Sequence, residues 1–226
     1  MHEPTETYDR GFEALFGDSI RLLLAAEENL YEYDSQFSFA RASIACSMLL
    51  PEVCANICIE SLKLECGVFN EIDKLSPIAK FDYYLGVYFR DRRLDRGCKA
   101  VQSLQELKRL RDRYVHPKKS KVDWVRGEDD TFHGSSPRTR ILDISENPQM
   151  WFQDDAVNAM RGVHGFLSYF FKDKCNYSKS KVTGLLFSED LVPSPADPII
   201  PYYANDFHNN MARWNIDVSY FRFGKL

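Results

Sequence analysis

The stretch 38–65 has the sequence SFARASIACSMLLPEVCANICIESLKLE and is apolar on most faces of a helix. A helix of this kind is buried on most of its sides, so we expect 38–66 to form the central helix of an all-α protein. Pro51 lies inside it and should kink the helix or split it in two, because proline removes a backbone donor and clashes with the preceding turn. Gly67 should mark its end.

Amphipathic segments flank this stretch. Apolar residues recur at three- and four-residue steps from 8 to 33, which predicts a long helix, and the polar residues 34–36 should end it. Ser76 followed by Pro77 has the form of an N-cap and a first helical residue, so another helix is expected at 77–89.

Two more helices are predicted further along the chain. The apolar spacing at 98–116 indicates a helix that Pro117 ends, because the residue before a proline is pushed out of helical geometry. The last clear helix is expected at 154–172, with Asp154 or Asp155 as its cap. Together these elements predict a bundle of four to five helices.

The remaining segments lack helical periodicity. Residues 118–150 are polar and interrupted by glycine and proline, which predicts a long loop. The prolines within 193–201 argue against a helix or a central strand there, and 216–223 is predicted to be a short strand. We therefore expect a helical bundle at 1–175 and a mostly irregular C-terminal extension at 176–226 packed on it.

Composition narrows the class of protein. A hydrophobic fraction of 44% is sufficient for a real core. The sequence has no uninterrupted apolar run long enough to span a bilayer, and its first residues carry neither a basic start nor an apolar segment. We expect a soluble, cytoplasmic protein without membrane contact.

Four cysteines fall in or next to the apolar stretch at spacings that are multiples of four: Cys46, Cys54, Cys58 and Cys66. Cysteine on a buried helix face behaves as a small hydrophobic residue. No Cys-x-x-Cys pair and no nearby histidine complete a familiar zinc pattern. We therefore expect free thiols in the core, with no metal and no cofactor.

Positive charge is concentrated in one segment. Between Arg90 and Arg126 there are thirteen Lys and Arg against five Asp and Glu, a balance of +8 in a chain of net charge −4. An acidic protein with such a segment can reserve it for an anionic partner. The alternative is a solvated helix face with ordinary ion pairs.

The run 107–119, LKRLRDRYVHPKK, ends a predicted helix inside the basic segment. Arg111 offers a planar fork of donors matched to phosphate oxygens, and His116 can exchange a proton near neutral pH. Together they could cleave RNA without a metal: the 2′-hydroxyl attacks the adjacent phosphorus, His116 moves the proton, and Arg111 stabilises the developing charge. Two protomers pairing here would supply both an acid and a base.

Arg111, Asp112 and His116 resemble the Arg-x(4–6)-His motif of the HEPN superfamily, in which a polar residue commonly follows the arginine. The resemblance covers about 8–171. It implies a HEPN-like bundle of four to five helices that acts as a homodimeric, metal-independent endoribonuclease, often a toxin or an antiviral effector, with Arg111, Asp112 and His116 as catalytic residues. Such proteins can have a protein antitoxin or regulator as partner.

Neighbouring residues are expected to support this site. Glu60, inside the apolar stretch, would face the bundle and meet Arg111 or His116, and Tyr114 would either stack on a base or pack in the fold. His164 is expected to be a structural histidine. The residues expected to bind RNA are Arg109, Arg113, Tyr114, Lys118, Lys119 and Lys121.

Three alternatives stay open. The same motif spacing is met by Arg109 with His116 and by Arg126 with His133. A non-catalytic HEPN-like module would bind RNA or a partner protein through the same basic face. A purely structural helical adaptor would have no affinity for nucleic acid.

Overall fold

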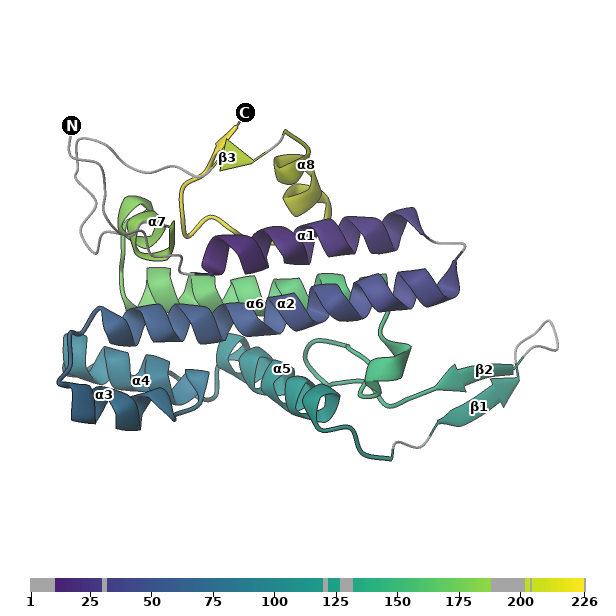
Figure 1. Cartoon of the computed structure of the whole chain (residues 1–226), viewed down its shortest axis with the longest axis horizontal. Coiled ribbons are helices and arrows are strands. Elements are labelled where there is room, and N and C mark those ends of the chain that lie inside the picture. The colour runs from purple at the N-terminus through teal and green to yellow at the C-terminus, as the bar shows by residue number, and fades with distance from the viewer. Residues whose placement is uncertain are drawn as a thin grey trace.

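The computed structural model describes residues 11–29, 32–119, 122–126, 132–187, 202–203 and 205–225, and this part of the chain is an all-α bundle with small β-elements (Figure 1). The α-helices are α1 (Phe12–Glu28), α2 (Tyr33–Glu60), α3 (Cys66–Asp73), α4 (Pro77–Tyr88), α5 (Lys99–Val115), α6 (Gln153–Ser168), α7 (Lys179–Phe187) and α8 (Asn205–Arg213). The remaining elements are the strands β1 (Asp123–Arg126), β2 (Phe132–Ser135), β3 (Tyr202–Tyr203) and β4 (Gly224–Lys225), the 3-10 helix η1 (Pro148–Met150) and the π-helix η2 (Tyr169–Lys174). The predicted all-α fold class is confirmed.

The core helix is α2, which packs against α1, α4 and α6. It begins at Tyr33, earlier than predicted, because Asp34 in the first turn favours a helix start and does not interrupt one. The helix continues through the buried Pro51, so the predicted split does not occur. Burial on several sides outweighs the roughly 3 kcal/mol that proline costs inside a helix.

Among the described helices, α2 is also the one that is long and apolar enough to cross a membrane, judged by length and composition alone. A core helix of a soluble protein meets the same criterion, and most of the apolar stretch of α2 is buried in the bundle.

The predicted central helix is divided at its C-terminal end. It ends at Glu60, and after a turn in which Lys63 adopts a φ of 50° the chain enters α3. Gly67 therefore lies in the first turn of α3 and does not end α2. Cys54 and Cys58 are free and buried as expected, whereas Cys66 is free and exposed on α3.

The later helices begin and end close to the predicted positions. α4 starts at Pro77 after Ser76, and α5 stops at Val115, two residues before Pro117. The carboxylate of Asp155, the third residue of α6, accepts the Phe152 backbone N–H at 3.2 Å, so the predicted cap acts from inside the first turn.

The segment between β2 and α6 is fixed to the bundle by buried polar contacts. The carboxylate of Glu106, only 3% exposed, accepts the backbone N–H groups of Ile141 and Leu142 at 3.0–3.2 Å. The side chain of Leu142 lies directly over Gly162 of α6, where an added Cβ would come within 2.7 Å of it. These contacts place the residues that follow, up to Gln149, beside the end of α5.

The predicted loop 118–150 contains structure that its composition did not indicate. β1 and β2 pair antiparallel, with Trp124 opposite Gly134 and Arg126 opposite Phe132. This hairpin extends well beyond the helices (Figure 1). A two-stranded hairpin buries few side chains. Its strands therefore show too little alternation of polar and apolar residues for the sequence to predict them.

The described part of the C-terminal extension shares the hydrophobic core of the bundle. The ring of Phe16 on α1 lies 5.5 Å from that of Phe207 and 5.8 Å from that of Phe221. The predicted strand at 216–223 is wrong, although buried residues alternate there. Asp217 accepts the backbone N–H of Ser219 at 2.9 Å, and this turn bends the chain out of a strand.

Candidate functional site at the end of α5

Arg111 lies near the end of α5 and is held by two carboxylates. Its Nη1 donates to Oε2 of Glu52 on α2 at 2.7 Å, and its Nη2 donates to Oδ1 of Asp112 at 3.2 Å. The side chain is 28% exposed. The guanidinium is thus fixed in position, and its charge is balanced within the protein.

Asp112 connects this ion pair to a second cation. Its Oδ2 accepts a hydrogen bond of 2.7 Å from Nζ of Lys108, one helical turn earlier. That hydrogen bond, with a smaller contribution from Arg111, lowers the pKa of Asp112 below its usual range. Asp112 is therefore an anion at neutral pH.

His116 caps the C-terminal end of α5. Its backbone N–H still bonds the carbonyl of Asp112 at 3.0 Å, but its own backbone has left helical geometry because Pro117 follows. The side chain is exposed and borders a cleft of about 750 Å³. The cleft lies between the end of α5, the start of the hairpin and the segment 146–149.

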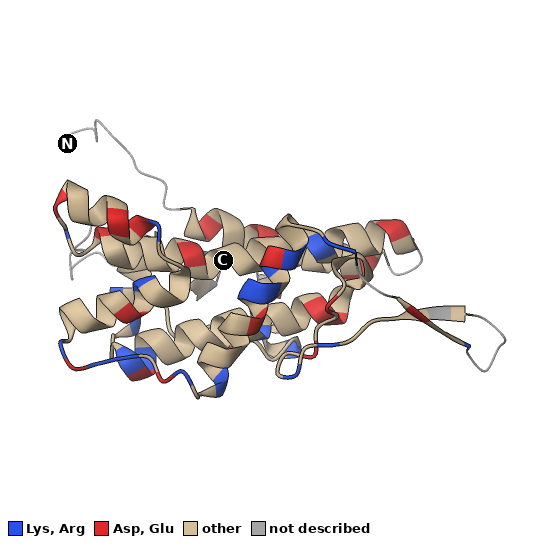
Figure 2. Cartoon of the chain, turned by 90° about the horizontal axis from the view of Figure 1, so that it is seen from below, with Lys and Arg blue, Asp and Glu red and all other residues tan. Residues whose placement is uncertain are grey.

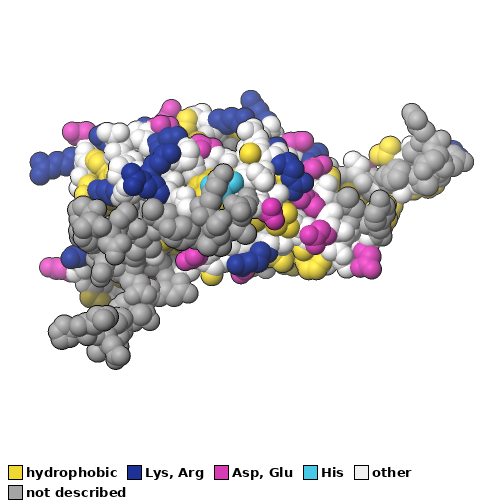
Figure 3. Space-filling model, turned by 90° about the horizontal axis from the view of Figure 1, so that it is seen from above, with side chains coloured by type: hydrophobic (Ala, Val, Ile, Leu, Met, Phe, Trp, Pro, Cys, Tyr) yellow, Lys and Arg dark blue, Asp and Glu magenta, His cyan; other side chains and the backbone are white. Residues whose placement is uncertain are grey.

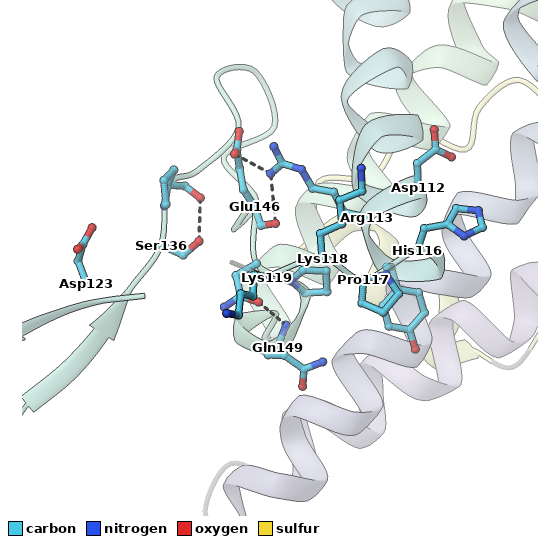
Figure 4. A pocket seen from close by; sticks show the side chains of 14 residues that line it. Asp112, Arg113, His116, Pro117, Lys118, Lys119, Asp123, Ser136, Glu146 and Gln149 are labelled. Atoms are coloured by element: carbon cyan, nitrogen blue, oxygen red, sulfur yellow. Dashed lines mark hydrogen bonds and ion pairs between the residues drawn. The ribbon is translucent and has the colours of Figure 1, made fainter. Parts of the chain in front are cut away.

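Figure 4 shows how the residues of the cleft are arranged. The side chains of Asp112 and His116 lie on one side of the end of α5, and Arg113 points the other way toward Glu146. Nη1 of Arg113 donates to Oε2 of Glu146 at 2.6 Å, which fixes the wall formed by 146–149.

Arg111 and His116 do not border the same hollow. Arg111 lines a small pocket of about 20 Å³ against α2 and α4, where Met48 and Pro77 are its neighbours. Asp112 is the link between the two sides, because it contacts Arg111 and also lines the cleft of His116. Within one chain the predicted pair is therefore joined through Asp112.

Part of the positive charge of 90–126 is paired with carboxylates, which include Asp82, Glu52 and Glu146 from outside the segment. The partnered side chains include Arg96 with Asp82, Lys108 with Asp112, Arg109 with Glu106, Arg111 with Glu52, and Arg113 with Glu146. Figure 2 shows Lys and Arg interspersed with Asp and Glu over the bundle, and both signs also lie close together on the opposite face (Figure 3). Carboxylates from other segments thus neutralise part of the positive charge that was counted along 90–126.

The other residues expected to contact RNA differ in how exposed they are. Lys118 and Lys119 are exposed and line the cleft, and Arg109 is exposed on α5. The ring of Tyr114 packs at 5.5 Å on the buried Trp151 while 38% of the residue stays exposed. Lys121 lies outside the described residues.

The supporting carboxylate expected at Glu60 lies elsewhere. Glu60 is exposed at the end of α2, and Glu52, two helical turns earlier, is the residue that meets Arg111. Both glutamates lie in the same apolar stretch, so the sequence contained the signal. Choosing between them required the crossing point of α2 and α5.

His164 is a buried residue of the core, as expected, but its Nε2 has no hydrogen-bond partner among the described residues, so the imidazole is only partly satisfied. Its Nδ1 lies 2.9 Å from the hydroxyl of Tyr220 and the side chain is fully buried. Burial lowers its pKa to about 3, and the nearby Asp217 opposes the shift. Within the described part of the chain, no three His, Cys, Asp or Glu side chains gather in a group that could hold a metal ion.

Comparison of the chain with protein-family models, with curated protein sequences and with solved structures finds no match to any of them.

Proposed function

We propose that the protein is a HEPN-like, metal-independent endoribonuclease that acts as a homodimer in the cytoplasm. The observation that carries the proposal is the exposed His116 at the end of α5, in a cleft that also contains Lys118 and Lys119. An imidazole and two ammonium groups that line one cleft suit a phosphodiester, because the lysines attract the phosphate and the histidine can transfer a proton.

In the proposed reaction the ribose 2′-oxygen forms a bond to the adjacent phosphorus. His116 accepts the proton of that hydroxyl, and the bond from phosphorus to the 5′-oxygen breaks. The 5′-oxygen takes a proton from a second imidazole, which a partner protomer supplies. The products are a 2′,3′-cyclic phosphate and a 5′-hydroxyl, and the cyclic phosphate can then be hydrolysed.

Arg111 would stabilise the charge that develops on the phosphoryl oxygens. Glu52 already holds Nη1, which leaves the fork oriented, and the phosphate would replace Asp112 as the acceptor for Nη2. Asp112 in this role positions Arg111 before RNA binds. A dimer formed at the end of α5 would bring the Arg111 of one protomer toward the His116 of the other.

A second function is favoured by one specific observation. Because both ends of the Arg111 guanidinium are bound to carboxylates, the site suits a HEPN-like module that binds RNA or a partner protein and does not cut. A protein antitoxin or regulator could bind the same end of α5. The two functions differ in whether the unmodified protein cuts the RNA that it binds.

The test is incubation of the purified full-length protein with RNA in EDTA, followed by analysis of the fragment ends. We expect fragments with cyclic phosphates and 5′-hydroxyls, and no cleavage of DNA of the same sequence, which lacks the attacking hydroxyl. His116→Ala and Arg111→Ala should abolish cleavage and leave RNA binding within a few-fold.

His133→Ala is the matched control, because it changes the other histidine that satisfies the motif spacing with a different arginine. Binding without cleavage by the unmodified protein would select the second function. Cleavage that persists in His116→Ala, or that stops in EDTA, would overturn the proposed catalytic site. A monomer at micromolar concentration in the presence of RNA would overturn the composite site.

A further inference from the structure

The hairpin formed by β1 and β2 exposes an unusual amount of aromatic surface. Trp124 is 69% exposed and Phe132 is 63% exposed. The hairpin projects beyond the bundle, with hydrophobic side chains visible on it in the space-filling view (Figure 3). Large apolar side chains exposed together on a projecting element are typical of a binding surface.

The register places these two rings on one face of the hairpin. Trp124 and Arg126 are two residues apart on β1 and therefore point to the same side. Phe132 is directly opposite Arg126, and directly paired residues share a face. Opposite Trp124 stands Gly134, which has no side chain to cover the indole. One face thus carries two exposed rings and an arginine that follows Trp124 on the same strand and lies opposite Phe132.

The same pairing separates the other residues of β1. Asp123 and Val125 alternate with Trp124 and Arg126, so they belong to the opposite face. The acidic side chain of β1 therefore lies away from the aromatic rings, and the basic one lies with them.

We infer that this face of the hairpin is a stacking platform for unpaired bases of a single-stranded RNA. The inference rests on the proposed function, because it concerns the substrate of the same protein. Every base has a flat π-surface that can stack on an aromatic ring, and an arginine beside the rings adds attraction to the phosphate and to the base. A protein partner would not require an arginine next to both rings.

The position of the platform relative to the cleft supports RNA as its occupant. Lys118 and Lys119 line the cleft, and the chain reaches β1 a few residues later, at Asp123. Asp123 itself also lines the cleft. The hairpin thus begins at the edge of the cleft, so a single strand with a phosphate at His116 can continue along the hairpin and stack bases further along the strand on Trp124 and Phe132.

The platform can be tested without cleavage. The probe is a 2′-O-methyl RNA of mixed sequence, about 12 nucleotides long, within the usual size of single-strand sites. Of the three tryptophans, Trp151 and Trp214 are buried, so a base that stacks on Trp124 should quench the exposed component of the fluorescence. A duplex of the same sequence should quench far less, because its bases are already stacked in pairs.

Variants then assign the site by fluorescence anisotropy of a labelled probe. Trp124→Ala and Phe132→Ala should each weaken binding by about 5- to 150-fold, the range observed for loss of one base–aromatic stack. Trp124→Phe should retain most of the affinity. Val125→Ala is the matched control, since Val125 is 56% exposed on the other face of the same strand and should leave binding unchanged.

The outcomes separate this inference from the proposed function. Quenching that Trp124→Ala abolishes, in a protein that fails to cut RNA, would keep the platform and reject the nuclease. Cleavage with unchanged probe binding by Trp124→Ala would reject the platform alone, as would equal quenching by the duplex or no binding of the probe by the unmodified protein. Loss of a dimer in Trp124→Ala, measured by sedimentation, would mean that a second copy covers this face and would also overturn the inference.

Discussion

Nη1 of Arg111 on α5 donates a 2.7 Å hydrogen bond to Oε2 of Glu52 on α2, and this contact joins the end of α5 to the core helix. Arg111 was expected from the sequence to bind phosphate, and its first partner is a carboxylate of the same chain. The contact therefore serves two purposes, since it stabilises the crossing of two helices and orients the guanidinium.

The first prediction concerns the strength of this contact. A double-mutant cycle with Glu52→Gln and Arg111→Gln should give a coupling of about 1 kcal/mol in the free energy of urea unfolding, because the pair is partly buried. The same cycle on Lys74 and Glu71, an exposed pair at 2.7 Å at the C-terminal end of α3, should give about 0.3 kcal/mol. Equal coupling in both cycles would mean that Glu52 does not position Arg111.

The second prediction concerns the carboxyl of Asp112. Its folded-state pKa is lowered, first by the hydrogen bond from Lys108. A lowered pKa stabilises the folded protein above the pKa of the unfolded chain, and this contribution disappears as the pH falls through the folded pKa. Carboxyl NMR titration should place Asp112 below an ordinary aspartate, and Lys108→Ala should raise its pKa. An unchanged titration in Lys108→Ala would exclude this cause.

The third prediction concerns Glu106, whose buried carboxylate accepts the N–H groups of Ile141 and Leu142. Glu106→Ala leaves both donors without this acceptor and should lower the free energy of unfolding by about 2–4 kcal/mol. Gln105→Ala, a neighbouring change on α5, should cost about 0.5 kcal/mol or less. Hydrogen exchange should accelerate at Ile141 and Leu142 in the first variant alone, and exchange at unchanged rates would show that the segment is held by other contacts.

The fourth prediction concerns His164, whose pKa is lowered to about 3 by burial. Between the unfolded-state pKa of about 6.5 and the folded value, only the unfolded chain binds the proton, so stability falls as the pH falls. The contribution is constant above that window. The unfolding free energy of the native protein should drop relative to His164→Gln by up to about 1.4 kcal/mol per pH unit below pH 6. Parallel curves from pH 7 to pH 4 would contradict a buried neutral imidazole.

The fifth prediction concerns the lysines of the cleft. Lys118→Ala and Lys119→Ala should each weaken RNA binding and reduce the dependence of log K on log salt by about 1, because one phosphate contact is lost. Their effect on the rate of cleavage at saturating RNA should be small. Lys179→Ala, an exposed lysine on α7, should leave both quantities unchanged, and a salt slope that stays constant in all three variants would place the RNA elsewhere.

The helices could be predicted because each has an apolar stripe or a clear boundary. Pro117 ends α5 and Ser76–Pro77 begins α4 through local chemistry that involves only neighbouring residues. The start of α2 was predicted too late. Asp34 is compatible both with the end of one helix and with the first turn of the next, and only packing decides between the two. α3 was missed because the turn at Lys63 carries no glycine or proline.

The sequence indicated that Arg111, Asp112 and His116 lie near one helix end, but it did not indicate their contacts. Arg111, Asp112 and His116 lie together at the end of one helix, which local spacing could indicate. Glu52 and Glu146 reach the same region from distant parts of the chain, so no pattern along the sequence identifies them. The exposed face of Trp124 depends on strand register, which a four-residue strand leaves undetermined in the sequence.

The packing of the C-terminal extension on α1 has a consequence for biosynthesis. Two ring neighbours of Phe16, Phe207 and Phe221, are translated about 190 to 205 residues after it. At typical rates of 5–20 residues per second, the part of α1 that packs on the extension waits roughly 10 to 40 s for these two rings. During that interval the apolar surface around Phe16 lacks these two neighbours and is available to chaperones or to aggregation, so slowing translation should reduce the soluble yield.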